Sequence, residues 1–188
     1  MVAKADGRFG ASAVATPANA ITAARVLATP VVLLLIVDLH TSWLAFAAWV
    51  AVASTDFVDG YVARRQGVTT SGAFLDPLAD KVLVLGALAC LAATGLAGWV
   101  PVLLIAGREL VISVYRSALS RRGVSVPASR LAKLKTLAQD AAVGFVLLPA
   151  TGRHDLWVGH DALWLAVGLA VVSGAQYLLQ SRRPATAV

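Results

Sequence analysis

Six long apolar segments constrain the fold of this chain more than any other feature of its sequence. They lie near residues 20–38, 43–65, 75–96, 99–120, 131–150 and 162–180. Each has about the 20 mostly apolar residues that are needed to cross the roughly 30 Å hydrocarbon core of a bilayer. Hydrophobic residues make up 59% of the chain and charged residues only 14%, which excludes an ordinary soluble domain. We therefore expect an integral membrane protein.

The connections between these segments are short and contain glycine, serine, proline or charged residues. Short connections make consecutive helices antiparallel neighbours in a bundle. The sequence thus predicts an all-α fold with one membrane domain of six transmembrane helices over residues 20–180. Residues 1–19 form an N-terminal segment and residues 181–188 a C-terminal tail, both predicted to be cytoplasmic.

The distribution of basic residues predicts the orientation. With the N-terminus inside, all but one of the basic residues that flank the segments fall on the cytoplasmic side, and only Arg153 falls outside, as the positive-inside rule requires.

The net charge of +6 could indicate a nucleic-acid partner, but the basic residues lack the interleaved aromatic side chains of a base-stacking surface. We expect no nucleic-acid partner and favour anionic lipids and phosphate groups.

Four of the ten acidic residues lie close together around the second connection: Asp56, Asp59, Asp76 and Asp80. The first pair is three residues apart and the second pair four, so each pair projects from one face of its helix. Because the connection reverses the chain, the two pairs can face each other across one small cavity at the cytoplasmic side.

Four carboxylates at a membrane edge need a strong compensating interaction. Oxygen ligands without nearby histidine or cysteine favour Mg²⁺ or Mn²⁺ over zinc or copper. The alternative is ion pairing with Arg64, Arg65 and Lys81, but three cations cannot neutralise four acids. Gly60 directly follows Asp59 and Gly72 precedes Asp76 by four residues. At such positions a missing side chain admits either a ligand or a closely packed helix.

These residues resemble the signature of a known family. The pattern Asp56-x-x-Asp59-Gly60-x-x-Ala63-Arg64, followed by Gly72-x-x-x-Asp76-x-x-x-Asp80, is similar to that of the CDP-alcohol phosphotransferases. The resemblance implies a homodimeric enzyme with six membrane helices and two divalent cations held by the four aspartates. It also implies that Asp80 is the general base and that Gly60, Arg64, Thr69 and Gly72 contact the cytidine diphosphate. The shorter spacing before Gly72 leaves open whether Thr69 or Thr70 does so.

Further positions resemble the phosphatidylglycerophosphate synthase branch of that family, which implies location in a bacterial plasma membrane. That branch transfers a phosphatidyl group from CDP-diacylglycerol to glycerol 3-phosphate. The resemblance rests on Leu75–Val84, on Gly107-Arg108-Glu109, and on an N-terminal stretch and a fifth-helix stretch that add the site candidates Asn19, Thr22, Arg25, Lys133, Lys135 and Gln139.

Three of these cations could form a pocket for the phosphate of an acceptor. Arg108, Lys133 and Lys135 can converge beside the aspartates from the cytoplasmic side. The alternative for the two lysines is ordinary flanking charge, and for Arg108 a structural pair with Glu109.

Other functions remain open from the sequence. A phosphatidylinositol phosphate synthase or a cardiolipin synthase of the same family would share the aspartates and differ in the acceptor pocket. A divalent-cation transporter is disfavoured because no polar positions continue the array outward along the segments.

Overall fold

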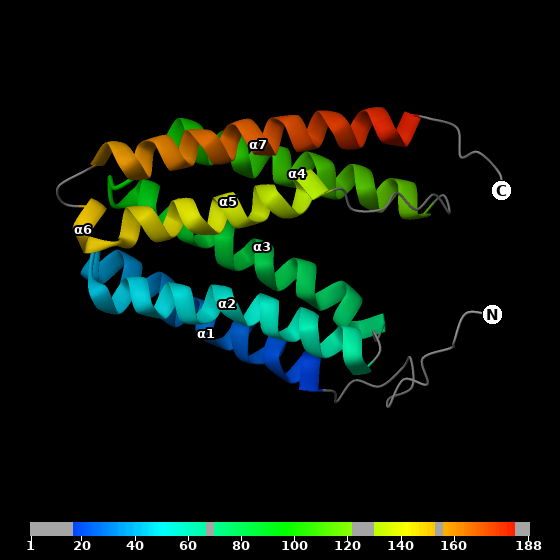
Figure 1. Cartoon of the computed structure of the whole chain (residues 1–188), viewed down its shortest axis with the longest axis horizontal. Helices are drawn as coiled ribbons and strands as arrows, with labels where there is room; N and C mark the ends of the chain where they lie inside the picture. The colour runs from blue at the N-terminus through cyan, green and yellow to red at the C-terminus, as the bar shows by residue number, and fades with distance from the viewer. Residues whose placement is uncertain (1–16, 67–69, 122–129, 153–155, 183–188) are drawn as a thin grey trace.

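The computed structural model of the chain describes residues 17–66, 70–121, 130–152 and 156–182, with side chains at 20–55, 78–121, 131–151 and 157–181. All regular secondary structure in this described part is helical, which confirms the all-α prediction (Figure 1). The helices are α1 (Pro17–Leu39), α2 (Trp43–Gln66), α3 (Thr70–Ala93), α4 (Trp99–Arg121), α5 (Arg130–Leu147), α6 (Pro149–Gly152) and α7 (Leu156–Arg182).

Six long helices correspond to the six apolar segments, but several ends differ from the expected positions. The third helix begins at Thr70 rather than 75 and the last at Leu156 rather than 162. Hydropathy locates apolar side chains, whereas the backbone hydrogen bonds of a helix continue through polar residues. The fifth segment ends at Leu147, and α6 adds one turn at Pro149. Proline disfavours helical geometry at the residue before it, which here is Leu148.

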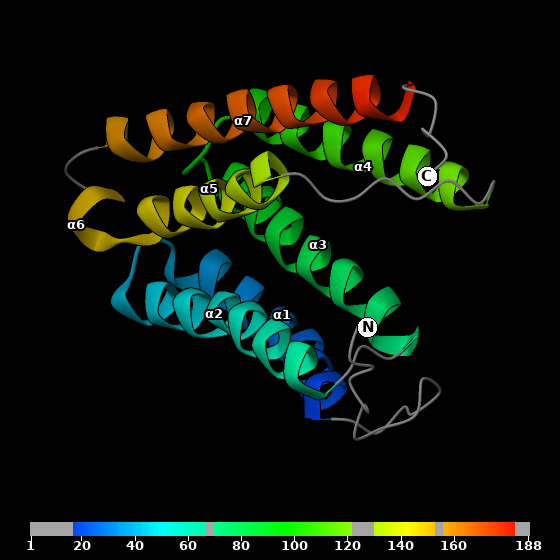
Figure 2. The ribbon, with the colours of Figure 1, turned by 45° about the vertical axis from the view of Figure 1, so that its right-hand side comes forward.

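The long helices form two groups that meet along α5. The first helix packs against α2 and α3, and α7 packs against α5 and α4. In Figures 1 and 2, α5 lies between α7 and α2. Its contact with α2 includes a hydrogen bond of 3.1 Å from the Trp49 indole nitrogen to the Asp140 carbonyl. The start of α1 and the end of α7 lie at the same end of the molecule, together with the end of α2 and the start of α3.

Small residues allow two of these helix pairs to approach closely. A Cβ atom at Gly159 on α7 would lie 2.8 Å from Cγ2 of Val146 on α5. A Cβ atom at Gly86 on α3 would lie 2.9 Å from Cδ1 of Leu33 on α1. Close packing at glycine is typical of helices that associate within a bilayer.

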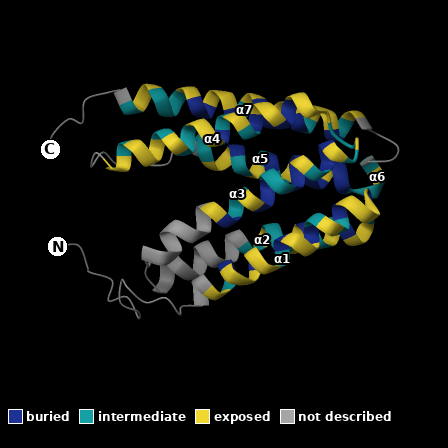
Figure 3. Cartoon of the chain, turned by 180° about the vertical axis from the view of Figure 1, so that it is seen from behind, coloured by how far each residue is buried: buried dark blue, intermediate teal, exposed yellow. Residues whose placement is uncertain are grey.

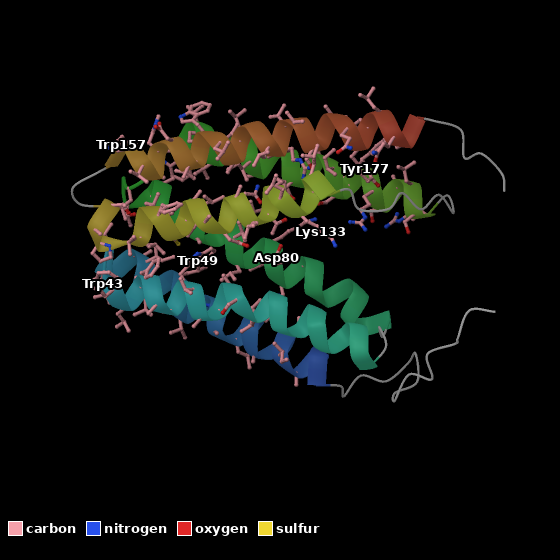
Figure 4. The ribbon with its side chains drawn as sticks, in the orientation of Figure 1. Trp43, Trp49, Asp80, Lys133, Trp157 and Tyr177 are labelled. Atoms are coloured by element: carbon pink, nitrogen blue, oxygen red, sulfur yellow. The ribbon has the colours of Figure 1, made fainter. Side chains whose placement is uncertain are left out.

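The outer surface of the bundle is apolar along much of its length. Leu27, Val114 and Leu179 are among many large hydrophobic side chains that are exposed, and Figure 3 shows exposed positions along α1, α4 and α7. Trp43, Trp99 and Trp157 are also exposed and stand at the starts of helices. Figure 4 shows Trp43 and Trp157 at the same end. Such a surface suits a lipid environment.

Two helices of the described part are long and apolar enough to cross a membrane by composition alone: Ala20–Leu39 and Trp157–Ser181. The side chains that the structure describes cover only 43–55 of α2 and 78–93 of α3, and Trp43–Thr55 is apolar but shorter than a membrane span. Membrane association is therefore consistent with the structure, while the number of six spans and their orientation stay predictions.

Candidate active site

The carboxylate array lies on two consecutive helices. Asp56 and Asp59 belong to α2, and Asp76 and Asp80 belong to α3. Both pairs therefore have the helical spacing that places their side chains on one face of the helix. Consecutive Cα atoms are 3.8 Å apart, so the end of α2 at Gln66 and the start of α3 at Thr70 lie within about 15 Å of each other.

Asp80 is the one member of the array whose side chain the structure describes. It is partly buried on α3, and Figure 4 places it in the middle of the molecule. Its carboxylate interacts electrostatically with the Lys135 ammonium on α5. Among the described side chains there is no group of three metal-ligating residues, and the side chains of Asp56, Asp59 and Asp76 lie outside that set.

A buried arginine reaches α2 beside the array. Arg25 on α1 is 2% exposed, and its Nε donates a hydrogen bond of 3.0 Å to the hydroxyl oxygen of Thr55. Thr55 immediately precedes Asp56. Thr22, one turn before Arg25, is also buried. The structure thus brings two of the predicted N-terminal candidates, Thr22 and Arg25, to the interior, while the side chain of Asn19 lies outside the described residues.

The side chains of the predicted nucleotide contacts also lie outside the described residues. Gly60 and Arg64 belong to the last turns of α2, and Gly72 belongs to the first turn of α3. Thr69 lies in the connection that the structure does not describe, whereas Thr70 begins α3.

A second group of charged residues joins α4, α5 and α7. Glu109 on α4 is 6% exposed, and its Oε1 accepts a hydrogen bond from the Lys135 ammonium on α5. The same oxygen accepts a 2.9 Å hydrogen bond from the Arg108 guanidinium. One carboxylate therefore bridges two of the three predicted acceptor cations.

Arg108 is bound to α7 as well as to Glu109. Its Nε donates to the Ala170 carbonyl and a terminal nitrogen donates to the Ser173 hydroxyl, both at 2.9 Å. Gly174 makes room for this contact, since a Cβ atom there would lie 3.2 Å from the Arg108 Nε. Arg108 therefore links α4 to α7, which the sequence did not predict. Its bond to Glu109 is the structural pair that the sequence offered as the alternative to an acceptor site.

The remaining two acceptor candidates on α5 differ from each other. Lys133 is exposed near the start of the helix (Figure 4). Gln139 is only 3% exposed, and its side-chain nitrogen has no hydrogen-bond partner. Since residues four apart share a helix face, Gln139 lies on the same side of α5 as the buried Lys135.

Sequence reasoning missed the pair between Glu109 and Lys135, and also a polar contact between α3 and α4. There the Lys81 ammonium donates to the Ser113 hydroxyl, which in turn donates to the Glu109 backbone carbonyl. The signal in the sequence was that charged residues inside apolar segments usually pair with one another. This signal does not identify the partners, because pairing between two helices depends on how each helix is rotated and on how deep each residue lies in the bundle.

Two grooves open on the surface of the bundle. A groove of about 330 Å³ between α2 and α5 is lined mainly by apolar side chains, with Ser54 and Asp140 nearer the array and Phe46 and Leu148 toward the other end. A groove of about 750 Å³ between α3 and α4 is apolar around Leu110 and polar around Arg116. Among the described side chains, the buried Lys135 ammonium and the partly buried Arg108 guanidinium are cations of the kind that binds phosphate.

Comparison with known proteins places these features in a wider context. The family model described as CDP-alcohol phosphatidyltransferase matches residues 15–172. A protein of Rickettsia typhi named CDP-diacylglycerol–glycerol-3-phosphate 3-phosphatidyltransferase is 38% identical over 85% of this chain and 93% of its own length. Proteins of the same name are 37% identical in Bacillus subtilis, over 85% of this chain and 91% of the relative, and 39% identical in Pseudomonas fluorescens, over 85% and 87%.

Proposed function

The chain belongs to the CDP-alcohol phosphatidyltransferase family, and we propose that it transfers a phosphatidyl group from CDP-diacylglycerol to glycerol 3-phosphate. The products are phosphatidylglycerophosphate and CMP. The observation that carries this proposal is the likeness to relatives whose names state both donor and acceptor, at 36–39% identity over at least 85% of this chain. The chain is thus an enzyme of phospholipid biosynthesis.

The array fits a divalent metal by the chemistry of its donors. Asp56, Asp59, Asp76 and Asp80 would hold two Mg²⁺ or Mn²⁺ ions, since carboxylate oxygens are the ligands that these cations prefer. Their positions on α2 and α3 have the helical spacing that such a site needs. The ions would neutralise charge on the pyrophosphate of the donor and on the departing CMP.

In this proposal Asp80 takes the proton from the acceptor hydroxyl. The hydroxyl oxygen then forms a bond to the lipid-side phosphorus as the bond from that phosphorus to the CMP oxygen breaks. Gly60, Arg64, Thr69 and Gly72 would contact the cytidine diphosphate, with Thr70 as the alternative to Thr69. Arg25 would support the array by its hydrogen bond to Thr55.

The acceptor phosphate would bind on the side of Asp80 that faces α5. Lys135 interacts electrostatically with Asp80, and Arg108 shares Glu109 with Lys135. Lys133 is exposed near the start of α5 and would attract a phosphorylated acceptor from the aqueous side. The cations therefore favour a charged acceptor over a neutral polyol.

A lipid donor also needs an apolar path for its acyl chains. The groove between α2 and α5 is apolar and passes Ser54, two residues before Asp56. Its volume of about 330 Å³ supports the fit of a lipid substrate, since ligand sites usually measure about 300–1,000 Å³. With the array at the cytoplasmic side, we propose a multi-pass protein of the bacterial plasma membrane with six spans. The proposed homodimer rests on the family resemblance alone.

A comparison of acceptors tests this function. Purified protein receives CDP-diacylglycerol and Mg²⁺ with glycerol 3-phosphate, inositol phosphate or phosphatidylglycerol, and CMP release is measured. We expect release with glycerol 3-phosphate to exceed release with the other two. A preference for inositol phosphate or phosphatidylglycerol would instead indicate a phosphatidylinositol phosphate synthase or a cardiolipin synthase.

A further inference from the structure

We propose that Glu109 is a positioning residue for the acceptor, which acts by holding the Lys135 ammonium in place beside Gln139. This inference rests on the proposed function and assigns a role to a residue that the proposed mechanism does not use. Glu109 would touch neither the CDP-lipid nor the reacting atoms. It would act through the cation that binds the acceptor phosphate.

The first observation is the position of Glu109 between α4 and α5. Its side chain is 8% exposed, and one oxygen, Oε1, accepts hydrogen bonds from both Arg108 and Lys135. Arg108 is fixed independently by Ala170 and Ser173 on α7. Among the described residues Lys135 has no hydrogen bond to a second partner, and its four-carbon stem is flexible. Of the two cations, Lys135 therefore depends more on Glu109 for its position.

The second observation is an unused donor next to Lys135. The Gln139 side-chain nitrogen is buried without a hydrogen-bond partner, one helical turn from Lys135 and on the same face of α5. Buried polar groups in folded proteins nearly always have partners, so an unpartnered amide suggests a polar ligand that completes it. An ammonium and an amide donor side by side suit the phosphate and hydroxyl oxygens of a small phosphorylated polyol.

The third observation is the position of Lys135 and Gln139 relative to the helix that carries Asp80. The helix that carries Lys135, α5, packs against α3, which carries Asp80, the proposed general base. A ligand bound by Lys135 would thus lie on the side of Asp80 that faces α5. Ordered placement of the ammonium by Glu109 would orient the acceptor hydroxyl, because a fixed cation leaves fewer ways for the phosphate to bind.

A double-mutant cycle tests this role. Glu109→Gln should raise the apparent KM for glycerol 3-phosphate by roughly tenfold and change the KM for CDP-diacylglycerol by less than about twofold. Glu109→Asp keeps the charge with a shorter reach and should show a smaller rise. In a Lys135→Met background, Glu109→Gln should add less than about twofold, because its effect passes through Lys135. Asp161→Asn, which removes an exposed carboxylate on α7, serves as the control.

Equal changes in both KM values, or an effect of Glu109→Gln that persists without Lys135, would overturn the positioning role. Should Glu109→Gln fail to fold, the variant with both Glu109→Gln and Lys135→Met removes the whole buried pair, which proteins often tolerate. Its acceptor KM should then equal that of Lys135→Met alone, and a further rise would contradict the inference. Wild-type protein that binds CDP-diacylglycerol but releases no CMP with glycerol 3-phosphate would contradict the proposed function itself.

Discussion

Arg25 on α1 donates a hydrogen bond of 3.0 Å from its Nε to the hydroxyl oxygen of Thr55 on α2, one residue before Asp56. Arg25 is 2% exposed, so this contact is made in the interior of the bundle. It fixes α2 against α1 at the level where the carboxylate array begins. A residue outside the family signature is thereby tied to the position of the array.

Loss of this contact should weaken the binding of divalent cations. Thr55→Val keeps the shape of the side chain but removes the acceptor for Arg25, a change worth about 1 kcal/mol or roughly a fivefold effect on an equilibrium. We expect the Mg²⁺ concentration for half-maximal activity to rise by about that factor. Thr94→Val is the control, because the Thr94 hydroxyl bonds only within its own segment, to the Cys90 and Leu91 carbonyls. A similar rise in both variants would contradict the role of Arg25.

Replacement of Asp80 should abolish transfer without loss of the fold. Asp80→Asn keeps the size of the side chain and removes both the proposed base and a proposed metal ligand, so we expect a loss of at least about 10²-fold in kcat. Thermal unfolding of the purified protein should stay close to that of the wild type, since Asp80 is only partly buried. Turnover that persists at saturating Mg²⁺ would rule out Asp80 as the base.

Arg108 should affect both acceptor binding and stability. Arg108→Ala removes the hydrogen bonds to Ala170 and Ser173 on α7 together with the bond to Glu109. We expect a higher KM for glycerol 3-phosphate and a lower unfolding temperature. Ser173→Ala removes a single bond to α7 and leaves the charge, so it should lower stability slightly and leave the acceptor KM unchanged. If Arg108→Ala lowers the unfolding temperature but leaves the KM for glycerol 3-phosphate unchanged, the role of Arg108 is purely structural.

Gln139 offers a test in which stability and activity should change in opposite directions. Its side-chain nitrogen is buried without a partner, so Gln139→Leu loses no donated hydrogen bond from that nitrogen and removes a desolvation cost. We expect equal or higher thermal stability and a raised KM for glycerol 3-phosphate. The matched control is Gln180→Leu on the exposed side of α7, which should leave the KM unchanged. An unchanged KM in Gln139→Leu would show that the amide does not contact the acceptor.

The fold was predictable from the sequence because hydropathy and short connections both depend on local residues. Six long helices follow the apolar segments, and their ends differ where polar residues extend a helix, as at Thr70, or where proline interrupts one, as at Pro149. The single turn α6 could not be predicted, since one turn leaves no periodic pattern. The number of membrane spans is still a prediction.

The site was predictable only in part. The spacing of the four aspartates and their positions on two helices follow from the sequence alone. The pairing of Glu109 with Lys135, which are 26 residues apart, depends on how α4 and α5 are rotated against each other. The same holds for the contact of Arg108 with Ser173, at a separation of 65 residues. Such long-range contacts are set by packing, which a single sequence does not display.

The most direct test of the account follows a label from acceptor to lipid. Purified protein is given CDP-diacylglycerol, Mg²⁺ and isotopically labelled glycerol 3-phosphate, and lipid products and CMP are measured together by mass spectrometry. We predict labelled phosphatidylglycerophosphate in equal amount to CMP, with neither product formed when Mg²⁺ is removed by a chelator. CMP release without label in the lipid, or product formation without a divalent cation, would contradict the account.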